Sequence, residues 1–122
     1  MATPVLQLAS PAAVAATVAL FALFLSATAF VAARNVLGDV NPVKALGVGP
    51  GPAVLATLPP TFGVNPFLAL GAAILVDAAG FYLLFERSPR LVAYITLIHV
   101  VVSIIAGAIV FGLLAIISSA PI

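Results

Sequence analysis

The chain has 122 residues, of which 65% are hydrophobic and 6% are charged, and its formal net charge is +1. An ordinary soluble domain is about 25% charged, so a chain of this composition cannot cover itself with polar surface in water. The absence of cysteine excludes disulfides, thiolate metal sites and cysteine nucleophiles, and so small a net charge gives no indication of nucleic acid as a partner.

Hydropathy predicts an all-α integral membrane protein. The mean hydropathy is +1.39, and several apolar runs approach or exceed the ~20 residues that an α-helix needs to cross hydrocarbon. We expect a single transmembrane domain over residues 1–122, with four transmembrane helices in an up-down bundle. Their predicted ranges are 12–33, 43–60, 66–85 and 91–118.

The first predicted helix carries no charge and follows Ser10-Pro11, a pair typical of an N-cap and a first-turn proline. The uncharged run is longer than the ~7–15 residues of a signal-peptide core, so we expect it to be retained as a spanning helix. Small side chains recur along it at alternating spacings of three and four, the heptad pattern of a helix contact. This packing seam comprises Ala12, Ala15, Ala19, Ala22, Ser26, Ala29 and Ala33.

The packing seam is predicted to be an interface. Membrane helices gain little by moving leucine from lipid to another helix, so close approach along small-residue faces is a main source of their association. The partner is either another helix of the same bundle or a second protein.

The second predicted helix starts after Asn41-Pro42 and is interrupted by glycine and proline. An interior proline removes one backbone hydrogen bond and costs ~3 kcal/mol or more, so we expect a kink or a break. The helix-break residues are Gly49, Pro50, Gly51 and Pro52. In lipid the freed carbonyls need partners, so this region should face protein or a wet cavity. It is either a discontinuous helix that holds a transported substrate or a kinked helix shaped for packing.

All basic residues fall in two of the three predicted connections. They are Arg34, Lys44, Arg87 and Arg90. With four spanning helices the first and third connections share one side of the cell membrane. The positive-inside rule therefore predicts that loops 34–42 and 86–90 are cytoplasmic and that the N-terminus and the C-terminus are outside.

The last two predicted helices each carry one ionisable group deep in an apolar run. Asp77 and His99 are equally distant from Ser88, the centre of the hairpin loop, and so lie at about the same depth. Asp77 is nine residues from Glu86, and His99 is nine residues from Arg90. Nine residues span ~13 Å along a helix, so both side chains lie well inside a ~30 Å hydrocarbon core. Thr96 and Ser103 share the face of His99 and are predicted to support it.

An ionised carboxylate near the bilayer centre costs ~2.5–3.5 kcal/mol, so Asp77 is expected to be protonated, paired or hydrated. His99 is its natural partner, while Thr96, Ser103 and the freed carbonyls of the second helix are alternatives. The intramembrane polar pair either fixes helix register or handles a proton or a substrate.

No cofactor, metal site or enzymatic activity is expected. A metal site needs three or four ligands, and one Asp with one His does not supply them. Haem held by His99 would need a second axial ligand, and the chain has no other histidine and only the initial methionine. No arrangement of nucleophile, base and oxyanion donors is visible.

Two stretches carry a resemblance to known proteins. They are "ATAFVAARNVLGDV" at the end of the first helix and "AILVDAAGFYLLFERSPRLVAYITLIHVVVSIIAGAIVFGLLA" across the last hairpin, in a chain with almost no lysine. In these features the chain resembles the small uncharacterised multi-pass membrane proteins of halophilic archaea. The resemblance implies an archaeal source and no mechanism.

Two functions remain open. The first is an interaction or assembly subunit in the lipid bilayer that packs through its small-residue seam against itself or a larger membrane complex. The alternative is a small proton-coupled transporter or channel-like protein that uses the Asp77–His99 pair.

Overall fold

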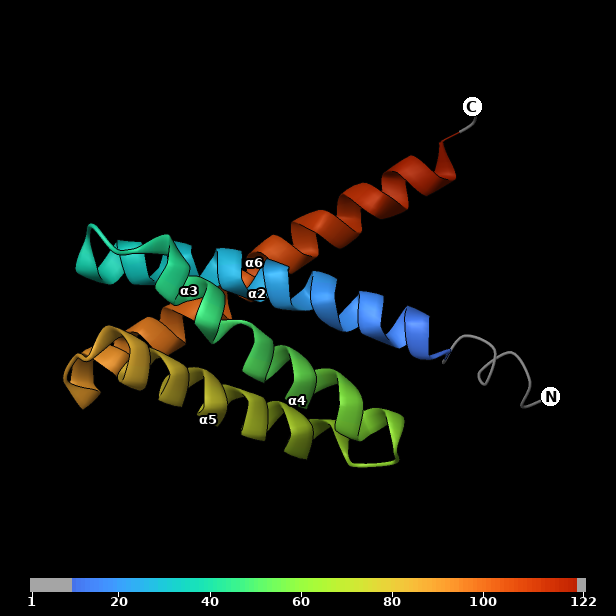
Figure 1. Ribbon diagram of the computed structural model, residues 1–122. Helices are drawn as coiled ribbons and strands as arrows, with labels where there is room; N and C mark the ends of the chain where they lie inside the picture. The colour runs from blue at the N-terminus through green and yellow to red at the C-terminus, as the bar shows by residue number, and fades with distance from the viewer. Residues whose placement is uncertain (1–9, 121–122) are drawn as a thin grey trace.

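The computed structural model describes residues 10–120, and every regular element in that range is an α-helix (Figure 1). The helices are α2 (Pro11–Leu37), α3 (Pro42–Val48), α4 (Pro50–Thr61), α5 (Pro66–Phe85) and α6 (Pro89–Ser119). Helices α2, α5 and α6 are long and apolar enough to cross a membrane. Helices α3 and α4 form the two parts of a kinked segment, which is the second of four in chain order. The predicted all-α fold with a kinked second segment is therefore confirmed. The predictions for the chain termini fall on residues 1–9 and 121–122, outside the described range.

Serine or asparagine followed by proline starts each of α2, α3, α5 and α6. The N-caps are Ser10, Asn41, Asn65 and Ser88, and each side chain accepts a hydrogen bond from a backbone N–H of the first turn. Proline fits the next position because its missing N–H would have no partner there. Helix α6 begins at Pro89, two residues before the predicted start, because Ser88 caps this helix as well as lying in the hairpin loop.

Helix α2 is longer than predicted at its C-terminal end. It continues beyond residue 33 through Arg34, a cation in the last turn that is favourable against the helix dipole. It ends at Gly38, whose φ of 82° is open to glycine at little cost and whose N–H donates to the Arg34 carbonyl at 2.9 Å.

The helices alternate in direction. Helix α2 packs against α3, α4 and α6, and α5 packs against the same three helices. The α2–α3 and α5–α6 connections lie at one end of the molecule, and the α4–α5 connection lies at the other end together with the start of α2 (Figure 1). All four basic residues are at or beside the first pair of connections, so they gather at one end.

The kink lies at Gly49, between α3 and α4. Gly49 keeps helical dihedral angles, φ −63° and ψ −41°, so the chain bends without unwinding. A Cβ on this residue would overlap the Ser26 side chain and the Ala22 carbonyl of α2. On the other side, a Cβ at Gly51 would lie 2.7 Å from a Val76 methyl group of α5. The missing side chains thus let the kinked segment fit closely between α2 and α5.

The packing seam of α2 is divided. Its C-terminal part, Ser26, Ala29 and Ala33, is buried inside the bundle, whereas Ala12, Ala15 and Ala19 are exposed. The buried part belongs to the hydrophobic core. That core comprises Ala29, Ala32, Ala33, Ala45, Val48, Phe81, Phe85, Val92 and Ile95. The seam is therefore an interface within the chain over its second half, where small side chains let α3 and α4 approach α2.

Helix α6 leaves the bundle after its crossing with α2. Figure 1 shows its C-terminal half diverging from the other helices. All residues from 108 to 120 are exposed, and most of them are large and apolar. The C-terminal half of α6 is therefore not covered by the other described helices.

Candidate functional site

The α5–α6 hairpin brings Asp77 and His99 into direct contact. Asp77 Oδ2 lies 2.5 Å from His99 Nδ1, and each residue is only 2% exposed. The contact follows from the short hairpin, which places residues equidistant from the turn at the same depth. The predicted pairing is present, and both groups are buried.

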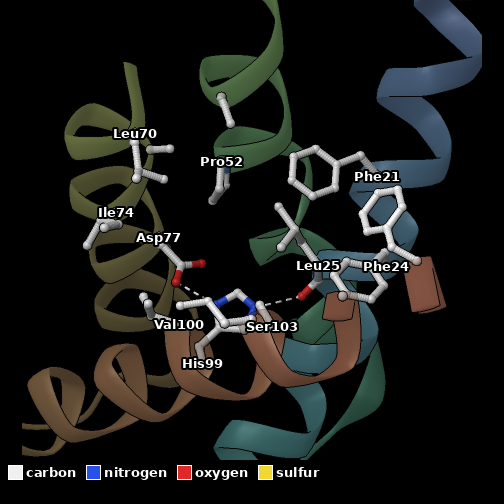
Figure 2. A pocket seen from close by; sticks show the side chains of 15 residues that line it. Phe21, Phe24, Leu25, Pro52, Leu70, Ile74, Asp77, His99, Val100 and Ser103 are labelled. Atoms are coloured by element: carbon white, nitrogen blue, oxygen red, sulfur yellow. Dashed lines mark hydrogen bonds and ion pairs between the residues drawn. The ribbon is translucent and has the colours of Figure 1, made fainter. Parts of the chain in front are cut away.

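The other ring nitrogen of His99 faces α2. Nε2 lies 2.9 Å from the carbonyl oxygen of Leu25 (Figure 2). It also lies 2.9 Å from Thr28 Oγ1. Thr28 Oγ1 in turn lies 2.8 Å from Ser103 Oγ, one turn along α6 from the histidine. A hydrogen-bonded network thus joins α5, α6 and α2 at the centre of the bundle.

The contacts favour one arrangement of protons on the pair. The Leu25 carbonyl can only accept a hydrogen bond, so its 2.9 Å contact with His99 Nε2 favours a hydrogen on that nitrogen. If Nδ1 and Oδ2 both lacked a proton, two lone pairs would face each other at 2.5 Å, which is repulsive. With a hydrogen on Nε2, one proton lies between Nδ1 and Oδ2. The pair is then either imidazolium with carboxylate or imidazole with carboxylic acid, and its net charge is zero in both forms.

Phe81 holds the imidazole from the side. Its ring is perpendicular to that of His99, with centroids 5.4 Å apart, and Phe81 is fully buried. Perpendicular contacts of this kind are favourable between aromatic rings. The contact fixes the plane of the imidazole, and with it the direction of both nitrogens.

An apolar cleft of ≈ 310 Å³ borders the pair. All three long helices and α4 contribute to its walls (Figure 2). The lining residues are Phe21, Phe24, Leu25, Pro52, Ala56, Leu70, Ala73, Ile74, Asp77, His99, Val100, Ser103, Ile104, Gly107 and Phe111. The last three lie on the part of α6 that leads into its exposed half.

Asp77 Oδ1 is the unpaired atom of the site. It has no hydrogen-bond partner among the described residues and exposes less than 1 Å². Figure 2 shows this oxygen pointing away from His99 toward the space between α5, α4 and α2. Oδ1 can only accept a hydrogen bond in both forms of the pair, because the shared proton lies at Oδ2.

The predicted supporting residues have different roles in the structure. Ser103 joins the network through Thr28 rather than by bonding His99. Thr96 is buried, yet its hydroxyl has no partner within residues 10–120. Of the helix-break residues, Pro52 lines the cleft. The backbone carbonyl at the histidine comes from Leu25 and not from the kinked segment.

Thr28, Leu25 and Phe81 have no signal in the sequence that singles them out. Thr28 lies 71 positions before His99 in an antiparallel helix, and no short loop relates their depths. The sequence shows Thr28 only as an uncharged hydroxyl group in an apolar helix, and Thr17 and Ser26 share this feature.

The chemistry of the site is hydrogen bonding and proton exchange. Asp77, His99 and Thr28 follow the order of a nucleophile triad, but the Leu25 carbonyl favours a hydrogen on Nε2, and in that form Nε2 does not take a proton from Thr28. Among the described residues no three His, Cys, Asp or Glu side chains could together hold a metal ion. The network can store one proton and offer an acceptor to a ligand.

Comparison with known proteins assigns a family and no activity. No curated protein and no solved structure gives a significant match. A halophilic archaeal source stays a prediction, since the matching family is described without one. That family's model covers residues 8–121, so the chain belongs to a family of unknown function, DUF7473.

Proposed function

We propose that the protein spans the cell membrane four times. Three helices have the length and composition of spanning segments, and their large apolar side chains are exposed on the outside of the bundle. The kinked segment Pro42–Thr61 is 20 residues long, which is ~30 Å at 1.5 Å per residue. The four cations at one end favour a cytoplasmic position for the α2–α3 and α5–α6 connections, with both chain ends outside.

Within this bundle we infer that the Asp77–His99 pair serves a small proton-coupled carrier. The observation that carries the proposal is the 2.5 Å contact between Nδ1 and Oδ2 in a buried site beside an open cleft. Ionisable residues inside membrane helices are costly, and they often belong to proton relays or substrate sites. Because the proton moves between the two atoms without changing the net charge, the pair can respond to a ligand without a desolvation cost for a new charge.

Proton-coupled transport is tested with Asp77→Asn. The amide introduced by this substitution would donate from its nitrogen to His99 Nδ1 and so keep the contact, but it holds no exchangeable acid proton. Protein in liposomes that contain a pH-sensitive dye should accelerate the decay of an imposed pH gradient when a transported compound is added from a panel of lipid-soluble molecules. The Asp77→Asn protein should not. Equal rates for both proteins with every compound would reject the proposal.

Assembly is the second candidate, and the exposed half of α6 favours it. Residues 108–119 are all exposed, and the exposed seam residues Ala12, Ala15 and Ala19 lie on α2, which packs against α6. Native mass spectrometry of the protein extracted gently from its own membrane tests this role. A stable oligomer or complex supports assembly, while a monomer with bound lipid alone argues against it.

A further inference from the structure

We propose that the cleft binds a neutral, lipid-soluble molecule that presents one hydrogen-bond donor, such as a hydroxyl group, to Asp77 Oδ1. The inference rests on the proposed function in using the same Asp77–His99 pair, and it adds the chemical class of the ligand. Asp77 Oδ1 is buried without a hydrogen-bond donor, and the charge and the shape of the cleft restrict which molecule can supply one.

Asp77 Oδ1 needs a hydrogen-bond donor. A carboxyl oxygen that is buried without a partner carries a free-energy penalty, because water satisfied it in the unfolded chain. Oδ1 accepts whether the shared proton is on Asp77 or on His99, so a donor satisfies it in both forms. A ligand that brings one donor removes the penalty and leaves the proton of the pair in place.

The charge of the site favours a neutral ligand. With one shared proton the pair has no net charge, and the other walls of the cleft are almost entirely hydrocarbon. A cationic ligand would introduce an uncompensated charge into this surrounding, which is expensive. An anionic ligand would meet the acceptor Oδ1 with another acceptor. A neutral molecule is therefore the best match.

The lining of the cleft favours a ligand with an apolar body. Phe21, Phe24 and Phe111 contribute aromatic rings, and the remaining lining is aliphatic apart from Asp77, His99 and Ser103. Ile104, Gly107 and Phe111 line the cleft on the side of the divergent half of α6, and this half of the helix is apolar and exposed. A ligand dissolved in the bilayer can enter there. Its donor reaches the buried Oδ1 once its apolar body displaces the side chains at the floor of the cleft.

The test compares probes with one ring system. Naphthalen-2-ol carries a donor, 2-methoxynaphthalene carries an acceptor only, 2-methylnaphthalene carries neither, and naphthalen-2-ylmethylammonium carries a cation. Their binding to the full-length protein in detergent is measured by titration calorimetry, corrected with protein-free micelles. We expect naphthalen-2-ol to bind roughly 10- to 100-fold more tightly than the methoxy and methyl compounds, the range expected when a buried acceptor gains its partner.

A site-specific signal accompanies the affinity. His99 is the only histidine, so ¹⁵N-histidine labelling gives one pair of ring signals. A donor on Oδ1 stabilises the carboxylate form of Asp77 and draws the shared proton toward Nδ1. The Nδ1 signal should therefore move toward the imidazolium position with naphthalen-2-ol and stay in place with 2-methylnaphthalene.

Three substitutions locate the site. Asp77→Leu should abolish the preference for naphthalen-2-ol while 2-methylnaphthalene still binds, which also shows that the variant is folded. Asp77→Asn keeps an acceptor at the place of Oδ1 and should keep the preference. Gly107→Leu places a side chain in the cleft, where its Cβ would lie 3.9 Å from Phe24, and should weaken all probes at least 10-fold. Gly112→Leu, on the same helix in open space, is the matched control.

Two results would overturn the inference. Equal affinity for all neutral probes would mean that the cleft holds lipid chains without reading a donor. Tighter binding of the ammonium compound would mean that the site selects cations. Neither result depends on transport, and Asp77→Asn separates the two proposals: it should abolish proton coupling and retain the preference for the donor.

Discussion

Ser26 on α2 donates a hydrogen bond from its Oγ to the carbonyl oxygen of Leu46, at 3.4 Å. Leu46 lies four positions before Pro50, so its carbonyl is the one that the missing N–H of that proline leaves without a helical partner. A small polar residue of the packing seam thus satisfies the backbone group freed at the kink. The expectation that the freed carbonyls face protein is met at this position, and the seam and the kink form one structural unit.

The close contact at Gly49 should make its substitution costly. In Gly49→Ala the new methyl group would overlap both Ser26 and the backbone carbonyl of Ala22, and we expect a loss of ~1–3 kcal/mol in the free energy of unfolding. Gly71→Ala, at an open position of α5, should instead gain up to ~1 kcal/mol from helix propensity. Unfolding in mixed detergent micelles measures both. The same sign for the two variants would contradict the close contact.

Two neighbouring residues, one on the seam and one off it, permit a matched comparison. Ala22→Leu inserts a large side chain toward the kink and should destabilise the fold by ~1–3 kcal/mol. Leu23→Ala, at a residue that is 59% exposed, should cost less than ~0.5 kcal/mol. Thermal unfolding of the purified variants compares them, and equal losses would remove the case for a directed interface.

The Asp77–His99 pair should show strong coupling in a double-mutant cycle. Asp77→Ala and His99→Leu each leave a buried polar partner unpaired and should cost ~1–3 kcal/mol, more if the remaining group is charged. The double variant should recover part of the loss, because both partners are then gone. Additive losses would show that the two residues do not contact each other in the folded protein.

Stability and activity together assign the role of the pair. If the pair only fixes helix register, the double variant regains stability and also keeps any proton-coupled transport. If the pair handles the proton, stability returns and transport does not.

Thr28 should contribute to the network in a way that another threonine of α2 does not. Thr28→Val keeps the shape of the side chain, removes its bond to His99 Nε2 and leaves Ser103 Oγ without this partner. We expect a loss of ~0.5–1.5 kcal/mol in the free energy of unfolding. Thr17→Val is the control, because that exposed hydroxyl bonds the carbonyl of Ala13 within its own helix. A loss at Thr17 equal to that at Thr28 would contradict the buried network.

Membrane orientation can be read from single cysteines, because the natural chain has none. A cysteine at Asp39, in the connection beside Arg34, should be protected from a membrane-impermeant thiol reagent in intact cells. A cysteine at Val64, in the α4–α5 connection, should react. The positive-inside rule requires this difference. Labelling at position 39 in intact cells would reverse the proposed orientation.

The sequence by itself determined the local structure. Serine or asparagine with a following proline marks the start of three predicted helices through interactions within one turn. The kink near Pro50 follows from a missing backbone N–H, which no partner can restore. The depth of Asp77 and His99 could also be predicted, because a short hairpin fixes the level of residues counted from its turn.

The tertiary structure decided which sides of the helices meet. A change of one residue in register rotates a side chain by about 100° around its helix, so the partners of His99 on α2 depend on how two distant helices are turned toward each other. That rotation selects Leu25 and Thr28 and leaves Thr96 without a hydrogen-bond partner among the described residues. The division of the seam into a buried and an exposed part, and the divergence of α6, likewise result from many packing contacts between distant segments. The cleft beside Asp77 is lined by residues of four helices, so no pattern within a single helix encodes it.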